Sequence, residues 1–192
     1  MATRQTRSVQ DARAQAVRRL HWGCGSITPD DWINSDVKDG AGVDLCCDIL
    51  AGLPLEDESI DYISSQHALQ DLDVYDVEPA LRELRRVLKP GGVLRLCLPD
   101  LERAITAFRD GRREYFSLWR WDTIDGDFIT WLLWLRYYTR SLYTYPFAAE
   151  LVRKAGFSEV QRVAYRETAS PYPEIVELDN RADESFYLEA VK

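Results

Sequence analysis

Residues 77–99 join a helical pattern, a turn and an apolar strand in one continuous stretch, and this order constrains the fold more than any other feature of the chain. Apolar side chains recur at helical spacing at Val77, Leu81, Leu84, Val87 and Leu88. The sequence Lys-Pro-Gly-Gly at 89–92 then predicts a helix end and a turn, and GVLRLCLPD predicts a strand. A helix that returns directly into an apolar strand is typical of α/β folds.

Short apolar runs on both sides of this stretch extend the alternation along the chain. The runs before the helix predict strands at residues 16–22, 31–37, 42–50 and 59–67. The segments after the turn and strand predict helices at 101–108 and 147–157, then strands at 159–167 and 185–192. Residues 168–184 are expected to form a loop that joins two antiparallel strands. The whole pattern predicts an α/β fold whose sheet is mostly parallel.

The first predicted strand ends in the sequence LHWGCGS at residues 20–26, which contains a Gly-x-Gly loop. Glycines allow a ligand to approach the backbone closely, because no Cβ intervenes. Only residues 26–31 separate this loop from the second strand, which is too short for a crossover helix, so we expect a loop or one helical turn there. Asp36 and Asp48 lie near the ends of the next two strands, where ligands of parallel sheets bind. Such acids can accept hydrogen bonds from ribose hydroxyls and from an adenine amino group.

Composition limits the partners that the chain can have. Its 192 residues suit one domain, predicted over 17–192, with an N-terminal arm at 1–16 and an aromatic-rich insert at about 110–146. The formal net charge of -8 argues against nucleic acid as a partner. The strongest apolar run, residues 128–135, is too short to span a bilayer, so we expect a cytoplasmic protein without a membrane partner. The cysteines and histidines have no zinc-type spacing, and no metal site is predicted.

Four segments together resemble the class I S-adenosylmethionine-dependent methyltransferases: LHWGCG…DWINSD, VDLCCDIL…LPLEDESIDYI, SSQHALQDL and LRELRRVLKPGGVLRLCLPDLE. The chain is most similar to small type 11-like methyltransferases with a shortened first crossover. These segments cover residues 20–103, and LVRKAGFSEV and ESFYLEAVK match more weakly. The resemblance implies a three-layer, Rossmann-like sheet of seven strands, mostly parallel with an antiparallel last strand. It also implies S-adenosylmethionine as the cofactor.

The resemblance carries a cofactor site over to nine positions of this sequence: His21, Gly23, Cys24, Gly25, Asp36, Asp48, Ile49, Ser65 and Gln66. In that family the two glycines would pass under the methionine and ribose portions. Asp36 would bind the ribose, and Asp48 with the Ile49 backbone would bind the adenine. The pair Ser65–Gln66 would lie beside the methionyl portion and the substrate.

The sequence departs from the family pattern at three places. His21 stands where Asn, Asp or Glu is usual, and Ile27 stands where many members have a third glycine. The sequence HALQD at 67–71 replaces the common HVLEH. His67 is the best candidate for a general base if the acceptor must lose a proton, and its alternative is a helix-start residue without a catalytic part. His21 is expected to be a packed or cofactor-facing residue.

Aromatic residues are concentrated between Tyr115 and Phe147. They are compatible with three structures: a substrate lid, the buried stripe of an amphipathic helix, or a homodimer interface. Core or interface packing is expected for most of them. Tyr115, Trp121 and Tyr138 are the predicted substrate-facing residues.

The sequence therefore predicts an S-adenosylmethionine-dependent methyltransferase that acts on a small-molecule acceptor. Two alternatives remain open. One is another reaction on the same cofactor, such as cyclisation or elimination, and the other is a cofactor-binding module without turnover. A nicotinamide-dependent oxidoreductase is less favoured, because its motif would place a third glycine where Thr28 stands. The acceptor and the atom that receives the methyl group are left undetermined.

Overall fold

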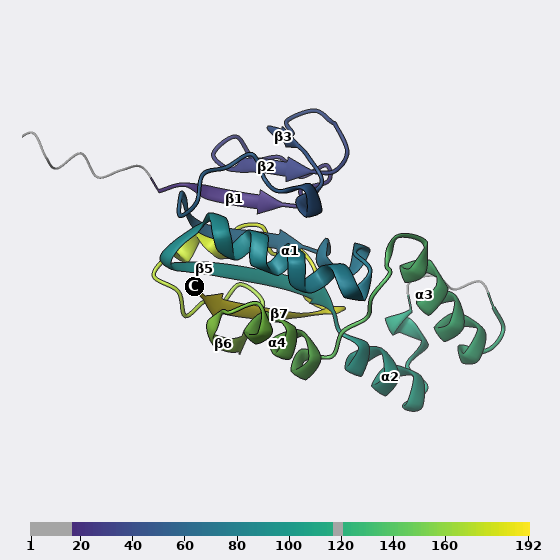
Figure 1. Ribbon diagram of the computed structural model, residues 1–192. Helices are drawn as coiled ribbons and strands as arrows, with labels where there is room; N and C mark the ends of the chain where they lie inside the picture. Colours follow the sequence, from purple (N-terminus) through teal and green to yellow (C-terminus); the bar gives the residue numbers. More distant parts are fainter. Residues whose placement is uncertain (1–16, 117–120) are drawn as a thin grey trace, which may run out of the picture.

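The computed structural model describes residues 17–116 and 121–192, and the side chains within these ranges except those of 133–138. The predicted N-terminal arm, residues 1–16, lies outside this part of the chain. Within the described ranges, a seven-stranded sheet has the order β3-β2-β1-β4-β5-β7-β6 (Figure 1). Its strands are β1 (Arg19–Trp22), β2 (Ile33–Asp36), β3 (Leu45–Cys46), β4 (Ile60–Gln66), β5 (Leu88–Pro99), β6 (Ser158–Val163) and β7 (Ser185–Val191).

The strand directions confirm the predicted α/β class. β1 to β5 pair in parallel, whereas β7 runs antiparallel to both β5 and β6. The loop at 168–184 therefore does join two antiparallel strands, as predicted. Residues 23–32 connect β1 to β2 by turns and bends without a helix, which confirms the shortened first crossover.

Helices α1 (Val74–Val87) and α4 (Tyr145–Lys154) pack on one face of the sheet (Figure 1). α1 begins after Asp73, whose carboxylate accepts a hydrogen bond from the Tyr75 amide and so satisfies one free donor of the first turn. The buried side of this helix consists of Val77, Ala80, Leu81, Leu84 and Val87. This spacing gives the helix one apolar face, which packs into the main core with the inward residues of β4, β5 and β7.

The opposite face of the sheet is covered by residues 164–184, which contain the 3₁₀ turn η4 (Pro173–Val176). A second hydrophobic cluster forms there from Trp32, Tyr62, Val93, Ile175 and Leu178. The chain between β6 and β7 thus occupies the face that a first crossover helix would cover in a longer chain. Its position was not predicted from the sequence.

The aromatic insert forms a small core of its own beyond the carboxyl end of β5 (Figure 1). It comprises the 3₁₀ turn η3 (Arg113–Tyr115) and α3 (Ile124–Tyr138), which pack against the preceding helix α2 (Leu101–Arg109). The rings of Phe108 and Phe128 stack with centroids 4.6 Å apart, and Phe116 and Trp131 are buried beside them. Helix packing therefore explains these aromatic residues. No helix in the described part of the chain combines the length and apolar character needed to cross a membrane.

Two local features differ from the sequence predictions. β5 begins at Leu88, and the predicted turn at residues 89–92 is a bulge within this strand. The register shows the bulge: Ile60 of β4 pairs with Leu88, and Tyr62 pairs with Val93. β3 ends at Cys46, so Asp48 lies beyond the strand and caps the 3₁₀ turn η1 (Ile49–Ala51). A further 3₁₀ turn, η2 (Leu69–Asp71), follows β4.

Candidate functional site

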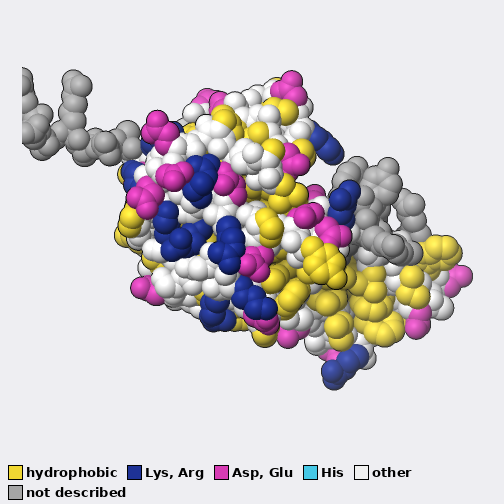
Figure 2. Space-filling model, in the orientation of Figure 1, with side chains coloured by type: hydrophobic (Ala, Val, Ile, Leu, Met, Phe, Trp, Pro, Cys, Tyr) yellow, Lys and Arg dark blue, Asp and Glu magenta, His cyan; other side chains and the backbone are white. Residues whose placement is uncertain are grey.

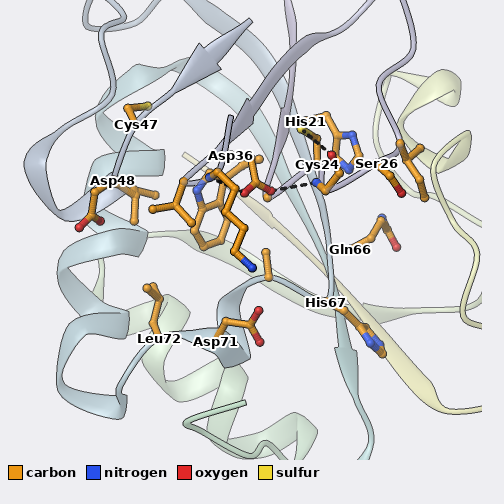
Figure 3. Close-up of a pocket in the computed structure, with 18 of the residues that line it drawn as sticks. His21, Cys24, Ser26, Asp36, Cys47, Asp48, Gln66, His67, Asp71 and Leu72 are labelled. Carbon is orange, nitrogen blue, oxygen red and sulfur yellow. Dashed lines mark hydrogen bonds between the residues drawn. The ribbon is translucent and has the colours of Figure 1, made fainter. Parts of the chain in front are cut away.

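A cavity of about 650 Å³ opens at the carboxyl ends of β1, β2 and β4 (Figure 3). The chain runs from β1 to β2 on one side, while β4 lies on the other side of β1, so the cavity sits at the switch point of the sheet. Open α/β sheets bind their ligands at this place. The lining includes nine residues singled out from the sequence: His21, Gly23, Cys24, Gly25, Asp36, Asp48, Ile49, Gln66 and His67.

The Gly-x-Gly loop is shaped by two glycines with positive φ. Gly23 has φ +69°, and a Cβ on it would lie 2.1 Å from the Cβ of Ala68, so this position has no room for a side chain. Its amide donates to the Ser35 carbonyl at 2.8 Å, which ties the loop to β2. Gly25 has φ +54° and faces open space, where a Cβ would meet no atom within 4 Å. The first glycine therefore serves packing, and the second keeps the cavity floor clear.

Asp36 is held in place by backbone donors from two loops. Its Oδ2 accepts a hydrogen bond from the Gly25 amide at 2.9 Å, and its Oδ1 accepts one from the Lys38 amide at 2.9 Å. The carboxylate remains half-buried at the middle of the cavity (Figure 3). Each carboxylate oxygen can accept more than one hydrogen bond, so Asp36 keeps acceptor capacity toward a ligand.

Asp48, Cys47 and Leu72 lie at one end of the cavity (Figure 3), and Ile49, which follows Asp48 in sequence, also lines it. The Asp48 Oδ1 accepts a hydrogen bond from the Leu50 amide at 2.9 Å, which fixes the start of η1. Ile49, the first residue of this turn, is buried and contributes apolar surface to the cavity. This end combines a carboxylate with apolar surface.

The opposite end contains buried polar atoms that lack partners. His21 is 1% exposed. The Ile27 backbone and the Asn34 side chain lie near its ring, but neither forms a hydrogen bond of good geometry with a ring nitrogen within the described residues. Burial lowers the pKa of His21 to about 4, so its ring is neutral at pH 7. Gln66 donates from Nε2 to the Ser64 hydroxyl at 3.1 Å, while its Oε1 has no partner in the same part of the chain. Figure 3 shows His21, Ser26 and Gln66 grouped at this end.

His67 directly follows β4 and has a left-handed backbone, with φ +53°. Its amide donates to the Cys97 carbonyl at 3.0 Å, and its Nε2 lies 2.7 Å from the Ser185 hydroxyl on β7. Burial, together with the positive charge of Arg181, lowers the pKa of His67 to about 3. The imidazole is therefore neutral at pH 7, and it links the ends of two strands beside the cavity.

Three predicted site residues, Ser65, Tyr115 and Trp121, do not line this cavity. Ser65 is buried, and its hydroxyl has no partner within the described residues. Tyr115 packs against Phe116 in the insert, and the Trp121 side chain is 56% exposed with its indole N–H donating to Thr130. Tyr138 ends α3, but its side chain lies outside the described side chains.

Sequence comparison relates the cavity region to methyltransferases. The family model for a methyltransferase domain matches residues 31–96. The demethylmenaquinone methyltransferase of Staphylococcus carnosus (strain TM300) is 38% identical over 65 residues, which cover 34% of this chain and 26% of that protein. The enzyme of the same name from Staphylococcus haemolyticus (strain JCSC1435) is 39% identical over 65 residues, with the same coverage. The chain thus spans about a quarter of the length of these curated relatives.

Solved structures extend the likeness to the whole described fold. A methyltransferase from Thermotoga maritima, described as a possible histamine N-methyltransferase, has a TM-score of 0.57 at 21% identity, covering 91% of this chain and 82% of that one. One from Archaeoglobus fulgidus has a TM-score of 0.57 at 13% identity, covering 92% and 87%. At these identities the likeness establishes a shared fold, and the family model adds the sequence match within it. Residues 31–96 thus match a methyltransferase domain, and the described part of the chain has the fold of S-adenosylmethionine-dependent methyltransferases.

The cofactor of this class of domain is S-adenosylmethionine, and the cavity fits a molecule of that kind. Its volume, about 650 Å³, lies within the range of small-molecule pockets. The open floor at Gly25, the anchored carboxylate of Asp36 and the unpartnered polar atoms of His21 and Gln66 supply the contacts that a polar nucleoside ligand requires. A cationic ligand also suits a lining in which aspartates outnumber lysine and arginine.

The methyltransferase domain also lines its cavity with residues that sequence reasoning did not single out as ligands. They are Trp22, Ser26, Ile27, Val37, Lys38, Cys47, Leu50, Ala68, Asp71, Leu72, Asp73, Asp76, Arg140, Asn180 and Arg181. Most of them neighbour predicted residues in sequence and could have been found by extending the motifs. Arg140, Asn180 and Arg181 come from distant segments, and no local motif marks them.

Proposed function

We propose that this chain transfers a methyl group from S-adenosylmethionine to a small-molecule acceptor. The observation that carries the proposal is the cavity at the switch point of the sheet, where the amide of Gly25 is bound to the carboxylate of Asp36. This arrangement places a glycine floor and an acidic acceptor side by side in a fold of the matching family.

The two ends of the cavity suit the two parts of the cofactor. Asp48 and the Ile49 backbone would hold the adenine, and Asp36 would accept hydrogen bonds from the ribose hydroxyls. The loop at 23–25, including Cys24, would pass beneath the ribose and the methionyl portion. His21 and Gln66 would accept hydrogen bonds at the methionyl end. Ser65 is not part of this proposal, because its side chain does not line the cavity.

A small acceptor fits the charge and the shape of the site better than a polymer. The net charge of -8 disfavours binding to nucleic acid. The partial relatives are named for demethylmenaquinone, and a structural neighbour from Burkholderia thailandensis for 1,6-didemethyltoxoflavin, with a TM-score of 0.51 at 14% identity, covering 91% of this chain and 70% of that one. Both of those names refer to small molecules.

Bound S-adenosylmethionine supplies an already activated methyl group, so the protein chiefly aligns the acceptor and excludes water. His67 is the predicted base, but a pKa near 3 makes its neutral imidazole weakly basic. Asp71 also lines the cavity, and desolvation raises its pKa to about 6. The site therefore favours an acceptor that needs no proton removal by His67 before the transfer. If a proton must leave, comparing the pH–rate profiles of His67→Asn and Asp71→Asn identifies its receiver.

Calorimetry with S-adenosylhomocysteine, the demethylated cofactor, tests the proposal. We expect saturable binding to the wild-type chain and a loss of about 10- to 100-fold in affinity for Asp36→Ala, since a hydrogen bond to a charged group is removed. Asp39→Ala is the matched control, because Asp39 is exposed and its carboxylate accepts only from the neighbouring Gly40 amide. Absence of binding to wild-type chain would refute the cofactor assignment.

The alternatives are separated by their products. Incubation with S-adenosylmethionine and a panel of amine, phenol and thiol acceptors is expected to give a methylated product. Formation of methylthioadenosine without any acceptor would instead indicate cyclisation or elimination. Tight binding with no product of either kind would indicate a module without turnover.

A further inference from the structure

The loop between β6 and β7 covers the face of the sheet opposite α1 and α4, and its last part reaches the cavity. Residues 164–184 take the place of a first crossover helix, and Ile175 and Leu178 bury their side chains against Trp32 and Tyr62. Arg19 on β1 adds a polar contact, with Nη1 3.6 Å from the carboxylate of Glu177. This loop is therefore packed onto the same strands whose ends form the site.

A buried ion cluster fixes the loop immediately before it enters the cavity. Arg95 on β5 is fully buried and donates from Nε to Asp179 at 2.9 Å and from Nη1 to Glu189 at 2.6 Å. The same guanidinium donates to the carbonyls of Ala164 and Glu167 near the start of the loop. A guanidinium with this many partners in a dry environment has one preferred geometry, so the position of residue 179 is set by the sheet.

The two residues after this anchor, Asn180 and Arg181, line the cavity. The Arg181 amide donates to the Tyr187 hydroxyl at 3.3 Å, and Nη1 donates to Glu184 at 2.9 Å. Within the described residues, Nε and Nη2 of Arg181 make no hydrogen bond. The side chain is 51% exposed. Gln66 on β4 pairs with Cys97 on β5, and Cys97 pairs with Tyr187 on β7, so the hydrogen bond from the Arg181 amide to the Tyr187 hydroxyl brings this residue to the side of the cavity where β4 ends.

The other cations of the lining are at a different place. The Arg140 amide donates to the Gln70 carbonyl of η2 at 2.7 Å, and the Lys38 amide donates to Asp36 after β2 at 2.9 Å, so these two residues enter the cavity from other elements. Arg181 therefore enters the cavity from the side where Gln66 ends β4. Gln66 Oε1 and the ring of His21 are buried at this end without a hydrogen-bond partner within the described residues. An amino-acid group carries one carboxylate and one ammonium, and this end offers a guanidinium for the first and neutral acceptors for the second.

We propose that Arg181, delivered by the anchored β6–β7 loop, binds the carboxylate of the cofactor's methionyl portion, while His21 and Gln66 accept from its ammonium group. This inference rests on the proposed function. It assigns recognition of the methionyl carboxylate to the β6–β7 loop, which covers the sheet face where a crossover helix is missing. It also accounts for His21, because a neutral ring can accept a hydrogen bond from an ammonium group without an acidic side chain.

Three ligands separate this inference from the proposed function. S-adenosylhomocysteine has both charged groups, decarboxylated S-adenosylhomocysteine lacks the carboxylate, and methylthioadenosine lacks both. For Arg181→Met we expect calorimetry to show about 10- to 100-fold weaker binding of S-adenosylhomocysteine, with no change for the other two ligands. Arg166→Met is the matched control, since Arg166 is an exposed arginine of the same loop that does not line the cavity, and it should leave all three affinities unchanged.

Each outcome has a defined meaning. Equal weakening of all three ligands by Arg181→Met, or no weakening of any, would overturn the carboxylate assignment. Binding of methylthioadenosine also serves as the check that the variant is folded. If wild-type chain binds none of the three ligands, the proposed function itself fails. If the wild-type chain binds the ligands and Arg181→Met changes none of the affinities, this inference fails and the proposed function stands.

Discussion

Replacing Arg95 with methionine tests how firmly the β6–β7 loop is attached to the sheet. The substitution removes the guanidinium but keeps an unbranched side chain of comparable length in the same space. It leaves the carboxylates of Asp179 and Glu189 buried, at 0% and 2% exposure, without their counter-charge. The ring of Tyr187, 4.9 Å from the guanidinium carbon, loses its cation contact at the same time.

The expected loss of unfolding free energy follows from the burial of all three charged side chains, Arg95, Asp179 and Glu189. Removing one partner of a buried ion pair costs about 3–5 kcal/mol of unfolding free energy, because the remaining charge is desolvated and uncompensated. For a chain of this size, that loss lowers the melting temperature by about 6–20 °C. The control is Arg82→Met, whose ion pair with Glu78 joins side chains that are 59% and 39% exposed. An exposed pair of this kind contributes below about 1 kcal/mol.

Urea denaturation followed by tryptophan fluorescence measures both variants. We expect a large shift of the midpoint for Arg95→Met and a small one for Arg82→Met. Because uncompensated charge causes the loss, adding Asp179→Asn and Glu189→Gln to Arg95→Met should recover part of it. A loss no larger than that of the control, or no recovery in the triple variant, would refute the view that this cluster anchors the loop.

Two further predictions concern the loop after β1 and the buried histidine. Gly23→Ala should destabilise the fold by about 2–4 kcal/mol, since this position has a positive φ and a Cβ there would lie 2.1 Å from that of Ala68. Gly25→Ala should lower the unfolding free energy by about 1 kcal/mol and chiefly weaken S-adenosylhomocysteine binding, since a Cβ there meets no atom within 4 Å. Equal midpoints in urea for the two variants would contradict this reasoning. His21, with a folded pKa of about 4 against 6.5 in the unfolded chain, contributes stability that is full above pH 6.5 and is lost as pH falls toward 4. Between pH 6.5 and 5 the loss from His21 is about 2 kcal/mol. His67, with a pKa of about 3, loses a similar amount over the same range, so His21→Gln should reduce the slope of the profile without abolishing it. An unchanged slope would count against a buried neutral ring.

Much of the site could be predicted because its residues lie close to strand ends in the sequence. Gly23, Gly25 and Asp36 follow short apolar runs, and parallel strands bring such positions to one edge of a sheet. Asp48 was also placed at this edge, although it caps η1 instead of ending a strand, since the capping of a 3₁₀ turn depends on local geometry that apolar patterning does not report. Prediction was weaker for the insert, where Tyr115 and Trp121 lie away from the cavity. Aromatic density alone does not distinguish a pocket wall from a small helical core.

The sequence by itself determined the α/β alternation, the parallel sheet and the glycine loop, because periodic burial and turn chemistry are local properties of the chain. Tertiary structure alone decided which segment covers the face without a crossover helix, and thereby brought Arg181 to the cavity. The sequence contains a sign of this in Arg95, a charged residue within an apolar strand. Its partners Asp179 and Glu189 are 84 and 94 residues away, and a pairing over such a distance is set by the packing of the loop on the sheet.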